Sequence, residues 1–393
     1  MKLGDNINPL KKNLRMKLKP KHSASDITIF SEMTALAIKN NAINLAQGFP
    51  DYEIDSTLKK LLAKATDQNF NQYAPLAGNP LLINNLIEFN KKRNINFSSN
   101  EITIIPGATY GIFTALSAIL EPNDEVIIIE PAYDSYQPAV EMNGGIPVFV
   151  SLNDDFELDW DELKSKISEK TKAIIVNSPH NPTGKIWRKN DWENLWQTIK
   201  NTDIIVISDE VYDLILFDDF EFSSALHHPE IRKRCFSVFS FGKMFHITGW
   251  KVGYIVANEH FIQSFRRIHQ YLTFSVNSPS QQALAEYLEV FDFAKNQEMM
   301  QQKRDFFLSE IQSLPFTLKN ISEGSYFQVL GYEKISNLDE KAFAYWLTEN
   351  YKVATIPLSA FYHHRKNTNL VRFCFAKKEE TILEAVKNLK RLV

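Results

Sequence analysis

Residues 240–254 read SFGKMFHITGWKVGY and place the hydroxyl of Ser240 and two lysines, Lys243 and Lys251, within twelve positions. The stretch directly follows an apolar, strand-like run at residues 235–239. A lysine at the end of such a strand is an unusual place for a positive charge unless something binds it or reacts with it. The segment therefore predicts a functional site, with two solvated loop charges as the alternative.

The three side chains together indicate what such a site would take. A lysine amine that its surroundings keep partly deprotonated can form a Schiff base with an aldehyde. Ser240 and Lys251 lie on either side of Lys243 and could together hold a phosphate. An aldehyde that carries a phosphate describes pyridoxal 5'-phosphate (PLP). The segment alone does not separate a PLP site from solvated lysines, so the rest of the chain has to decide.

The composition excludes several classes of protein. The chain has 393 residues, of which 44% are hydrophobic and 23% charged, with a net charge of -3. This balance argues against a nucleic-acid-binding protein, and no apolar stretch approaches the ~20 residues that a membrane span needs. Cys235 and Cys374 lie in apolar runs and read as buried thiols, so no disulfide framework and no metal site are expected.

The N-terminal segment is basic, with seven lysines and arginines among the first 21 residues against the single acid Asp5. It lacks the apolar core of a secretory signal and the Arg- and Ser-rich composition of a targeting peptide. We therefore expect a solvated basic arm on a cytoplasmic protein.

Short β-branched runs alternate with longer helical patterns through the middle of the chain. The runs are residues 101–105, 125–129, 172–176, 204–207, 235–239 and 252–256. Apolar strands separated by helix-length segments indicate an α/β fold with a mostly parallel sheet that helices cover on both faces. A long helical pattern follows, from about residue 288 to about Ser313, and then shorter α and β patterns.

This change of pattern predicts a second, smaller α+β domain that the N-terminal segment completes, beside a large domain that holds the candidate PLP-binding residues. The predicted parts are an N-terminal arm with part of the small domain (1–55), the large domain (56–287) and the C-terminal small domain (288–393).

Distinctive polar residues follow the predicted strands, where ligands sit in a parallel sheet. Asp209 follows the fourth run, residues 204–207, with Ser208 between them. Tyr212 comes three residues after Asp209. A carboxylate paired with the pyridine nitrogen of PLP keeps that nitrogen protonated, and a phenol could donate to the ring 3'-oxygen. The alternatives are a helix N-cap or a salt-bridged acid for Asp209, and a core aromatic for Tyr212.

Further segments carry candidate binding groups. Asn181, in the rigid loop SPHNPTG at residues 178–184, could donate to the 3'-oxygen or be an ordinary turn residue. Small residues at 107–109 open a helical pattern whose backbone N–H groups could meet a phosphate. Tyr133 could stack on the pyridine or pack in the core. Arg372, inside an apolar strand, needs a partner, either a substrate carboxylate or an internal acid.

The order and spacing of these motifs resemble the class I/II aminotransferases of fold type I, from about Asn44 to Phe375. QGFP at 47–50, YAPLAG at 73–78, HNPTGK at 180–185 and residues 240–253 resemble the methionine and kynurenine aminotransferase branch. QYLTFSVN at 270–277 and EGSYF at 323–327 are similar to the bacterial methionine aminotransferases in particular.

The resemblance implies PLP as the cofactor and a role for each matching residue. The catalytic residues would be Lys243, which forms the Schiff base, Asp209 and Tyr212. The cofactor-binding residues would be Ala108, Thr109, Tyr133, Asn181, Asp209, Tyr212, Ser240, Lys243, Lys251 and, from the other subunit, Tyr73. The substrate-binding residues would be Gly48, Tyr133, Asn181, Phe274 and Arg372. Many family members have arginine at the position of Lys251. The lysine keeps the positive charge but lacks the bidentate fork of arginine.

The implied activity is transfer of the amino group of methionine, or of an aromatic or apolar amino acid, to a 2-oxo acid. The aromatic surface expected in the pocket suits such side chains, and no clear second arginine for a dicarboxylate is visible. A kynurenine or glutamine transaminase, or a cysteine-conjugate C–S β-lyase, is the alternative on the same scaffold. A PLP-binding regulator is disfavoured because the N-terminal extension is too short for a DNA-binding module.

The resemblance also implies a homodimer whose active sites are completed across the subunit interface. Tyr73 and residues 271–274 are the segments expected at that interface.

Overall fold

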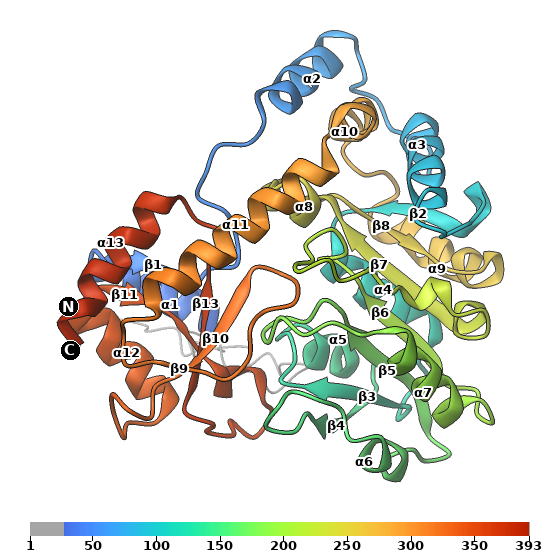
Figure 1. The fold of residues 1–393 in the computed structure, drawn as a ribbon. Coiled ribbons are helices and arrows are strands. Elements are labelled where there is room, and N and C mark those ends of the chain that lie inside the picture. The colour runs from blue at the N-terminus through green and yellow to red at the C-terminus, as the bar shows by residue number, and fades with distance from the viewer. Residues whose placement is uncertain (1–26, 393) are drawn as a thin grey trace, which may run out of the picture.

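A seven-stranded sheet forms the centre of the larger part of the molecule (Figure 1). The computed structural model describes residues 27–392, so the basic arm predicted from the first 21 residues lies outside the described residues. The strand order is β2-β8-β7-β6-β5-β3-β4. These strands are β2 (Ile102–Ile105), β3 (Glu125–Glu130), β4 (Ile146–Ser151), β5 (Thr171–Asn177), β6 (Ile205–Asp209), β7 (Cys235–Ser240) and β8 (Gly253–Val256).

The sheet is mostly parallel, as the sequence predicts. Neighbouring strands from β4 to β7 pair in parallel, whereas β8 runs antiparallel to both β2 and β7. All six predicted strands are present within a few residues of their predicted bounds. β4 is not among them, because it is an edge strand with a proline at position 147 and partly exposed side chains, so it gives a weak strand signal.

Helices cover both faces of this sheet, and the alternation of side chains along β3 shows how. Ile127 and Ile129 pack on one face with side chains of α6 (Trp160–Ser165) and α7 (Lys189–Ile199). Val126 and Ile128 pack on the other face. The helices on that second face are α4 (Ala108–Ile119), α5 (Tyr136–Met142) and α9 (Glu259–Leu272). The period of two along the strand therefore supplies two separate cores.

A smaller antiparallel sheet of order β12-β13-β10-β9 lies in the C-terminal part of the chain. Its strands are β9 (Thr317–Leu318), β10 (Phe327–Gly331), β12 (Ile356–Pro357) and β13 (Leu370–Cys374). Beside it, β1 (Ile43–Asn44) from the N-terminal part pairs in parallel with β11 (Val353–Ala354). The helices here are α1 (Ile29–Lys39), α12 (Glu340–Tyr351) and α13 (Glu379–Leu389). We call this part the small domain.

A long helix connects the two parts (Figure 1). The helical pattern predicted from about residue 288 is α11 (Phe293–Ile311), which runs from beside the large sheet to α13. It follows α10 (Ser278–Val290), which packs against α2 (Ser56–Asp67) and α3 (Pro80–Lys91). The short helix α8 (Phe241–Met244) follows β7 directly. The division of the chain after residues 55 and 287 stays a prediction.

Two expectations from the composition hold for residues 27–392. Among these residues, no helix combines the length and the apolar character that crossing a membrane requires. Cys235 and Cys374 are both buried and form no disulfide.

Candidate active site

A cavity of about 440 Å³ lies at the carboxyl ends of β5, β6 and β7, where ligands bind in open α/β sheets. It brings together most of the site residues predicted from the sequence. Those that line it are Gly48, Ala108, Thr109, Tyr133, Asn181, Asp209, Tyr212, Ser240, Lys243, Lys251 and Arg372. Tyr73 and Phe274 do not line it.

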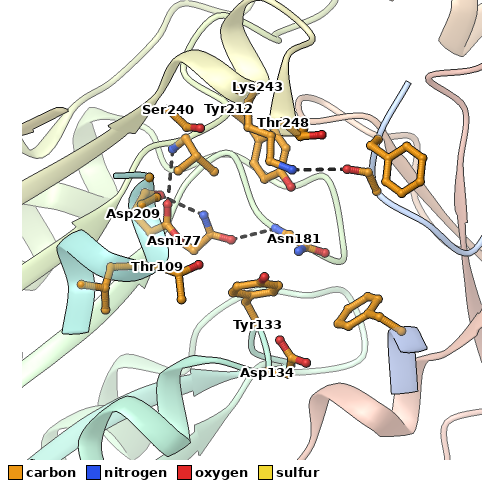
Figure 2. Close-up of a pocket in the computed structure, with 18 of the residues that line it drawn as sticks. Thr109, Tyr133, Asp134, Asn177, Asn181, Asp209, Tyr212, Ser240, Lys243 and Thr248 are labelled. Atoms are coloured by element: carbon orange, nitrogen blue, oxygen red, sulfur yellow. Dashed lines mark hydrogen bonds between the residues drawn. The ribbon is translucent and has the colours of Figure 1, made fainter. Parts of the chain in front are cut away.

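The Lys243 amine reaches into this cavity from α8, directly after β7 (Figure 2). Its Nζ donates to the Tyr326 hydroxyl at 2.8 Å and lies 3.3 Å from the Gly48 carbonyl oxygen. Burial lowers the pKa of Lys243 to about 8, and the nearby positive charges of Arg372 and Lys251 act in the same direction. A buried lysine with a depressed pKa is suited to act as a nucleophile or a base.

Asp209, the last residue of β6, is buried at the floor of the cavity. Its Oδ2 accepts a hydrogen bond from the Tyr136 hydroxyl at 2.6 Å, and Asn177 Nδ2 donates to its backbone oxygen at 2.8 Å. Burial raises the pKa of Asp209 to about 6, although the Tyr136 bond and the charge of Lys243 oppose this shift. Among the described residues no cation forms an ion pair with Asp209, so the carboxylate is available to a positively charged ligand atom.

Asn177, at the end of β5, also positions the loop that carries Asn181 (Figure 2). The Asn177 Oδ1 accepts a hydrogen bond from the Asn181 backbone N–H at 2.8 Å. Asn181 lines the cavity, and its side-chain Oδ1 accepts a hydrogen bond from Arg372.

An anion-binding corner lies where α4 begins. Its N-cap residue, Gly107, has φ +89°, and no side chain caps the first N–H groups of the helix, which belong to a segment that lines the cavity. A Cβ at position 107 would lie 3.1 Å from Lys251 Nζ. Ser240, the last residue of β7, lines the same cavity. Backbone N–H groups, an ammonium and a hydroxyl are a donor set that suits a phosphate.

Arg372 lies within β13 and is 1% exposed. Its Nη1 donates to Asn181 Oδ1 at 2.7 Å and its Nη2 to the Ala46 carbonyl at 2.7 Å. Its Nε has no hydrogen-bond partner among the described residues, and the guanidinium lies 3.9 Å from the centroid of the Phe327 ring. Burial lowers the pKa of Arg372 to about 10.

The alternative of an internal salt bridge for Arg372 is therefore wrong within residues 27–392, where no acid lies at ion-pair distance from it. A buried cation that is bound only by neutral oxygens can still accept a carboxylate.

Main-chain carbonyls of residues 46–49 hold three cations of the site region. Those of Ala46 and Gly48 contact Arg372 and Lys243, and the Phe49 carbonyl accepts from Lys377 Nζ at 2.7 Å. We call residues 46–49 the carbonyl strap.

The arrangement fits PLP. It combines one reactive amine, one buried carboxylate that lies apart from that amine, and a phosphate-binding corner within a single cavity. Tyr133 and Tyr212 line the same cavity between these groups. Burial raises the pKa of Tyr133 to about 12, so its phenol stays neutral and can donate hydrogen bonds at physiological pH.

Tyr73 and Phe274 lie on the surface, where they contact each other. Their ring centroids are 5.4 Å apart, and the two residues are 80% and 45% exposed. Tyr271, nearby in sequence, is 85% exposed. Three large exposed aromatic side chains in one area indicate a surface that something covers.

Among the residues that the sequence analysis gave no role are Tyr136, Asn177 and Tyr326, which contact site residues directly. Asn177 carried a usable signal, because it is a polar residue at the end of a buried strand, like Asp209. Tyr136 and Tyr326 reach Asp209 and Lys243 only through the tertiary structure.

Comparisons with known proteins give a consistent result. The family model described as aminotransferase class I and II matches residues 40–389. The chain is 42% identical over 376 residues to the methionine aminotransferase of Escherichia coli (strain K12), covering 93% of this chain and 96% of that protein. It is 33% identical over 432 residues to a kynurenine–oxoglutarate transaminase of Dictyostelium discoideum, covering 98% and 99%.

Solved structures agree with this. A structure from Escherichia coli, described as having a methionine aminotransferase function, superposes with a TM-score of 0.93 at 40% identity, covering 96% of this chain and all of that one. N-succinyldiaminopimelate aminotransferase from Mycobacterium tuberculosis superposes with a TM-score of 0.89 at 31% identity, covering 95% of this chain and 100% of that one.

Proposed function

The chain belongs to the class I and II aminotransferases, in the branch of methionine aminotransferase and kynurenine transaminase, and we propose that it transfers the amino group of methionine to a 2-oxo acid. Aromatic and other apolar amino acids are further donors in this proposal. The observation that carries it is the Lys243 amine, whose pKa is lowered to about 8, in a cavity that also contains Asp209 and Arg372.

Enzymes of this family depend on PLP, so this chain is a PLP-dependent aminotransferase. When bound, PLP supplies an aldehyde that condenses with amines and a ring that accepts the electron pair released at the substrate α-carbon. We propose that Asp209 pairs with the ring nitrogen and that Asn181 and Tyr212 donate to the 3'-oxygen. The proposed phosphate ligands are Ser240, Lys251 and the N–H groups of Ala108 and Thr109, and Tyr133 stacks on the ring.

Lys243 is the proposed general base. A pKa near 8 leaves a fraction of the amine neutral at physiological pH, and this neutral form can take the proton from the substrate α-carbon. The Tyr326 hydroxyl and the Gly48 carbonyl hold the Lys243 amine while it is free. The proton then has a short path, because one side chain both removes and returns it.

Arg372 is the proposed ligand of the substrate α-carboxylate, with Asn181 and Gly48 beside it. Its unpartnered Nε and its two neutral acceptors leave the positive charge uncompensated. A carboxylate would complete these hydrogen bonds in the bidentate geometry that a guanidinium favours.

The rest of the cavity supports an apolar substrate side chain. The aromatic residues Phe30, Phe49, Tyr133 and Phe327 line it, and the rings of Phe30 and Phe327 contact Arg372. Within the described residues, Lys243, Lys251 and Arg372 are the cations that line the cavity, and each already has a proposed task. No further guanidinium among the residues that line the cavity is left for a distal carboxylate, so a thioether or an aromatic ring fits better.

The test is product formation from a panel of amino acids against several 2-oxo acids. We expect wild-type enzyme to convert methionine most efficiently among the donors, and Lys243→Ala to lose both turnover and the absorbance of the lysine-linked cofactor. Lys170→Ala is the matched control, because Lys170 is exposed and does not line the cavity. An active Lys243→Ala enzyme would overturn the proposal, and pyruvate and ammonia from a cysteine conjugate without added oxo acid would indicate a β-lyase instead.

A homodimer is part of this proposal. The exposed aromatic residues Tyr73, Tyr271 and Phe274 form a surface that a second copy would cover. In the dimer, the partner subunit's Tyr73 would add a hydroxyl to the phosphate-binding corner.

A further inference from the structure

One charged residue of the cavity has no task in the proposed reaction. The charged side chains that line the cavity are Asp134, Asp209, Lys243, Lys251 and Arg372. Asp209 and Lys251 are assigned to the cofactor, Lys243 to proton transfer and Arg372 to the α-carboxylate. Asp134 has no assigned role, although burying a charge costs free energy unless the charge is paired or hydrogen-bonded.

Asp134 lies in the loop between β3 and α5, next to Tyr133, and Figure 2 shows its carboxylate at the edge of the cavity. Among the described residues, no side chain forms an ion pair or a hydrogen bond with this carboxylate. Burial raises the pKa of Asp134, and the positive charges of Arg372 and Arg365 oppose that shift. Arg365 donates to the Ala360 carbonyl at 3.2 Å and does not line the cavity. The carboxylate therefore faces the space that a substrate would fill.

This position has a consequence for the substrate side chain. Since Arg372 takes the α-carboxylate, the substrate side chain extends among the remaining residues of the cavity wall. These include Phe30, Phe49 and Asp134, all of which line it. A second carboxylate on the substrate would meet a like charge there, and each described cation that lines the cavity already has another proposed task.

Building on the proposed function, we propose that Asp134 is a specificity-determining residue that excludes substrates with a negatively charged side chain. The exclusion applies to both half-reactions, because the amino donor and the 2-oxo acid acceptor occupy the same cavity in turn. The substrate class is thus amino acids and 2-oxo acids with uncharged side chains, including those with an N–H or O–H group that can donate to the Asp134 carboxylate.

The expected size of the effect follows from Coulomb's law. Two like charges about 7 Å apart, at an effective dielectric constant of about 20, lower binding by about 10- to 100-fold. Replacing Asp134 by asparagine removes the charge and keeps the shape of the side chain, so it isolates this electrostatic effect from any change in packing.

The experiment compares two ligands that lack an amino group and so bind without reacting. Glutarate carries a second carboxylate, and 4-(methylthio)butyrate carries a thioether of similar length. With the PLP-loaded enzyme, we expect Asp134→Asn to shift the ratio of the two Kd values about 10- to 100-fold in favour of glutarate. The ratio of kcat/KM for glutamate to that for methionine should shift in the same direction.

The controls keep the outcomes distinct. Asp155→Asn, at an exposed aspartate outside the cavity, should leave both ratios at the wild-type value. Wild-type enzyme should itself bind glutarate more weakly than 4-(methylthio)butyrate. This comparison does not depend on whether a variant folds. An active enzyme whose ratios do not change in Asp134→Asn overturns this inference alone. A wild-type enzyme that converts no amino acid overturns the proposed function and this inference with it.

Discussion

The Lys243 amine and the Tyr326 hydroxyl lie 2.8 Å apart, and the same hydroxyl lies 2.6 Å from the Gly48 carbonyl oxygen. A phenol has one proton, which goes to the carbonyl, so its oxygen accepts a hydrogen bond from the lysine. This bond favours the charged form of Lys243 and opposes the effect of burial, which lowers the pKa to about 8. Tyr326 therefore positions the amine and, by accepting a hydrogen bond from it, favours its charged form.

Replacing Tyr326 by phenylalanine should lower the pKa of Lys243 by about one further unit, because the ammonium loses an acceptor. The measurement is the pH dependence of Lys243 acylation in cofactor-free protein, followed by mass spectrometry of the lysine peptide. Tyr332→Phe is the matched control, since this buried hydroxyl donates to the Leu338 carbonyl at 2.8 Å in the small domain. A pKa that stays the same or rises in Tyr326→Phe would show that the hydroxyl does not stabilise the ammonium.

Capture of PLP by cofactor-free wild-type protein should depend on pH in a defined way. The neutral amine is the reactive form, and the pKa of Lys243 is lowered from 10.5 to about 8. As the pH rises toward 8, the neutral fraction of the amine increases about tenfold for each pH unit, and above pH 8 it levels off. Stopped-flow absorbance across pH 6 to 10 measures this rate. A plateau reached only near pH 10 would contradict the lowered pKa.

Asp209→Asn should separate stability from function. Burial raises the pKa of Asp209 from 3.8 to about 6, so at pH 7.5 the folded cofactor-free protein holds a carboxylate that would be better solvated in the unfolded chain. Removing that charge should raise the free energy of unfolding by about 2 kcal/mol at pH 7.5, and the gain should vanish as pH falls from 6 to 4. Turnover should fall at least ~100-fold, because the ring nitrogen loses its partner.

Urea denaturation of the cofactor-free protein at several pH values gives the first quantity, and steady-state kinetics gives the second. If Asp209→Asn is less stable than wild type at pH 7.5, the ionised carboxylate must be better solvated in the folded state than its burial implies.

Gly107→Ala should weaken PLP binding by at least ~10-fold, because φ is +89° and the new methyl group would meet Lys251 Nζ at 3.1 Å. Gly249→Ala provides the matched control, since no atom lies within 4 Å of its added Cβ. Fluorescence titration of cofactor-free protein with PLP and with pyridoxal separates the two effects. Only PLP should lose affinity, because pyridoxal has no phosphate to bind at the start of α4.

The dimer can be tested at the exposed aromatic residues. The double variant Tyr73→Ser, Phe274→Ser should shift the sedimentation coefficient from that of two chains toward that of one, and should also weaken PLP binding. Leu318→Ser is the control, because Leu318 is 45% exposed, as Phe274 is, but lies on β9. A wild-type enzyme that sediments as a single chain would reject the interface.

The fold and much of the cavity could be predicted because their signals are local. A β-branched run followed by a polar residue is visible within ten positions, and Asp209 and Ser240 both stand at such strand ends. The contacts that tune these groups could not be predicted in this way. Tyr136 is 73 residues from Asp209, and Tyr326 is 83 residues from Lys243, so only the packing of separate elements brings each pair together.

Arg372 shows the same limit. Its place in an apolar strand predicted that it needs a partner, but the Ala46 carbonyl that it contacts lies 326 residues away in sequence. The sequence does not reveal which main-chain carbonyl will bind a cation, because every residue has one. The choice between a substrate carboxylate and an internal acid therefore had to wait for the tertiary structure.

The carbonyl strap has a consequence for how such an enzyme could diversify. It binds Arg372, Lys243 and Lys377 through main-chain carbonyl oxygens. These oxygens remain in place when the side chains of the strap are changed. Gln47 and Phe49, whose side chains belong to the same segment, line the cavity. Substitutions at these two positions can reshape the wall without releasing the cations. A gene copy could thus acquire a new amino-acid preference in single steps, each of which leaves a working catalyst.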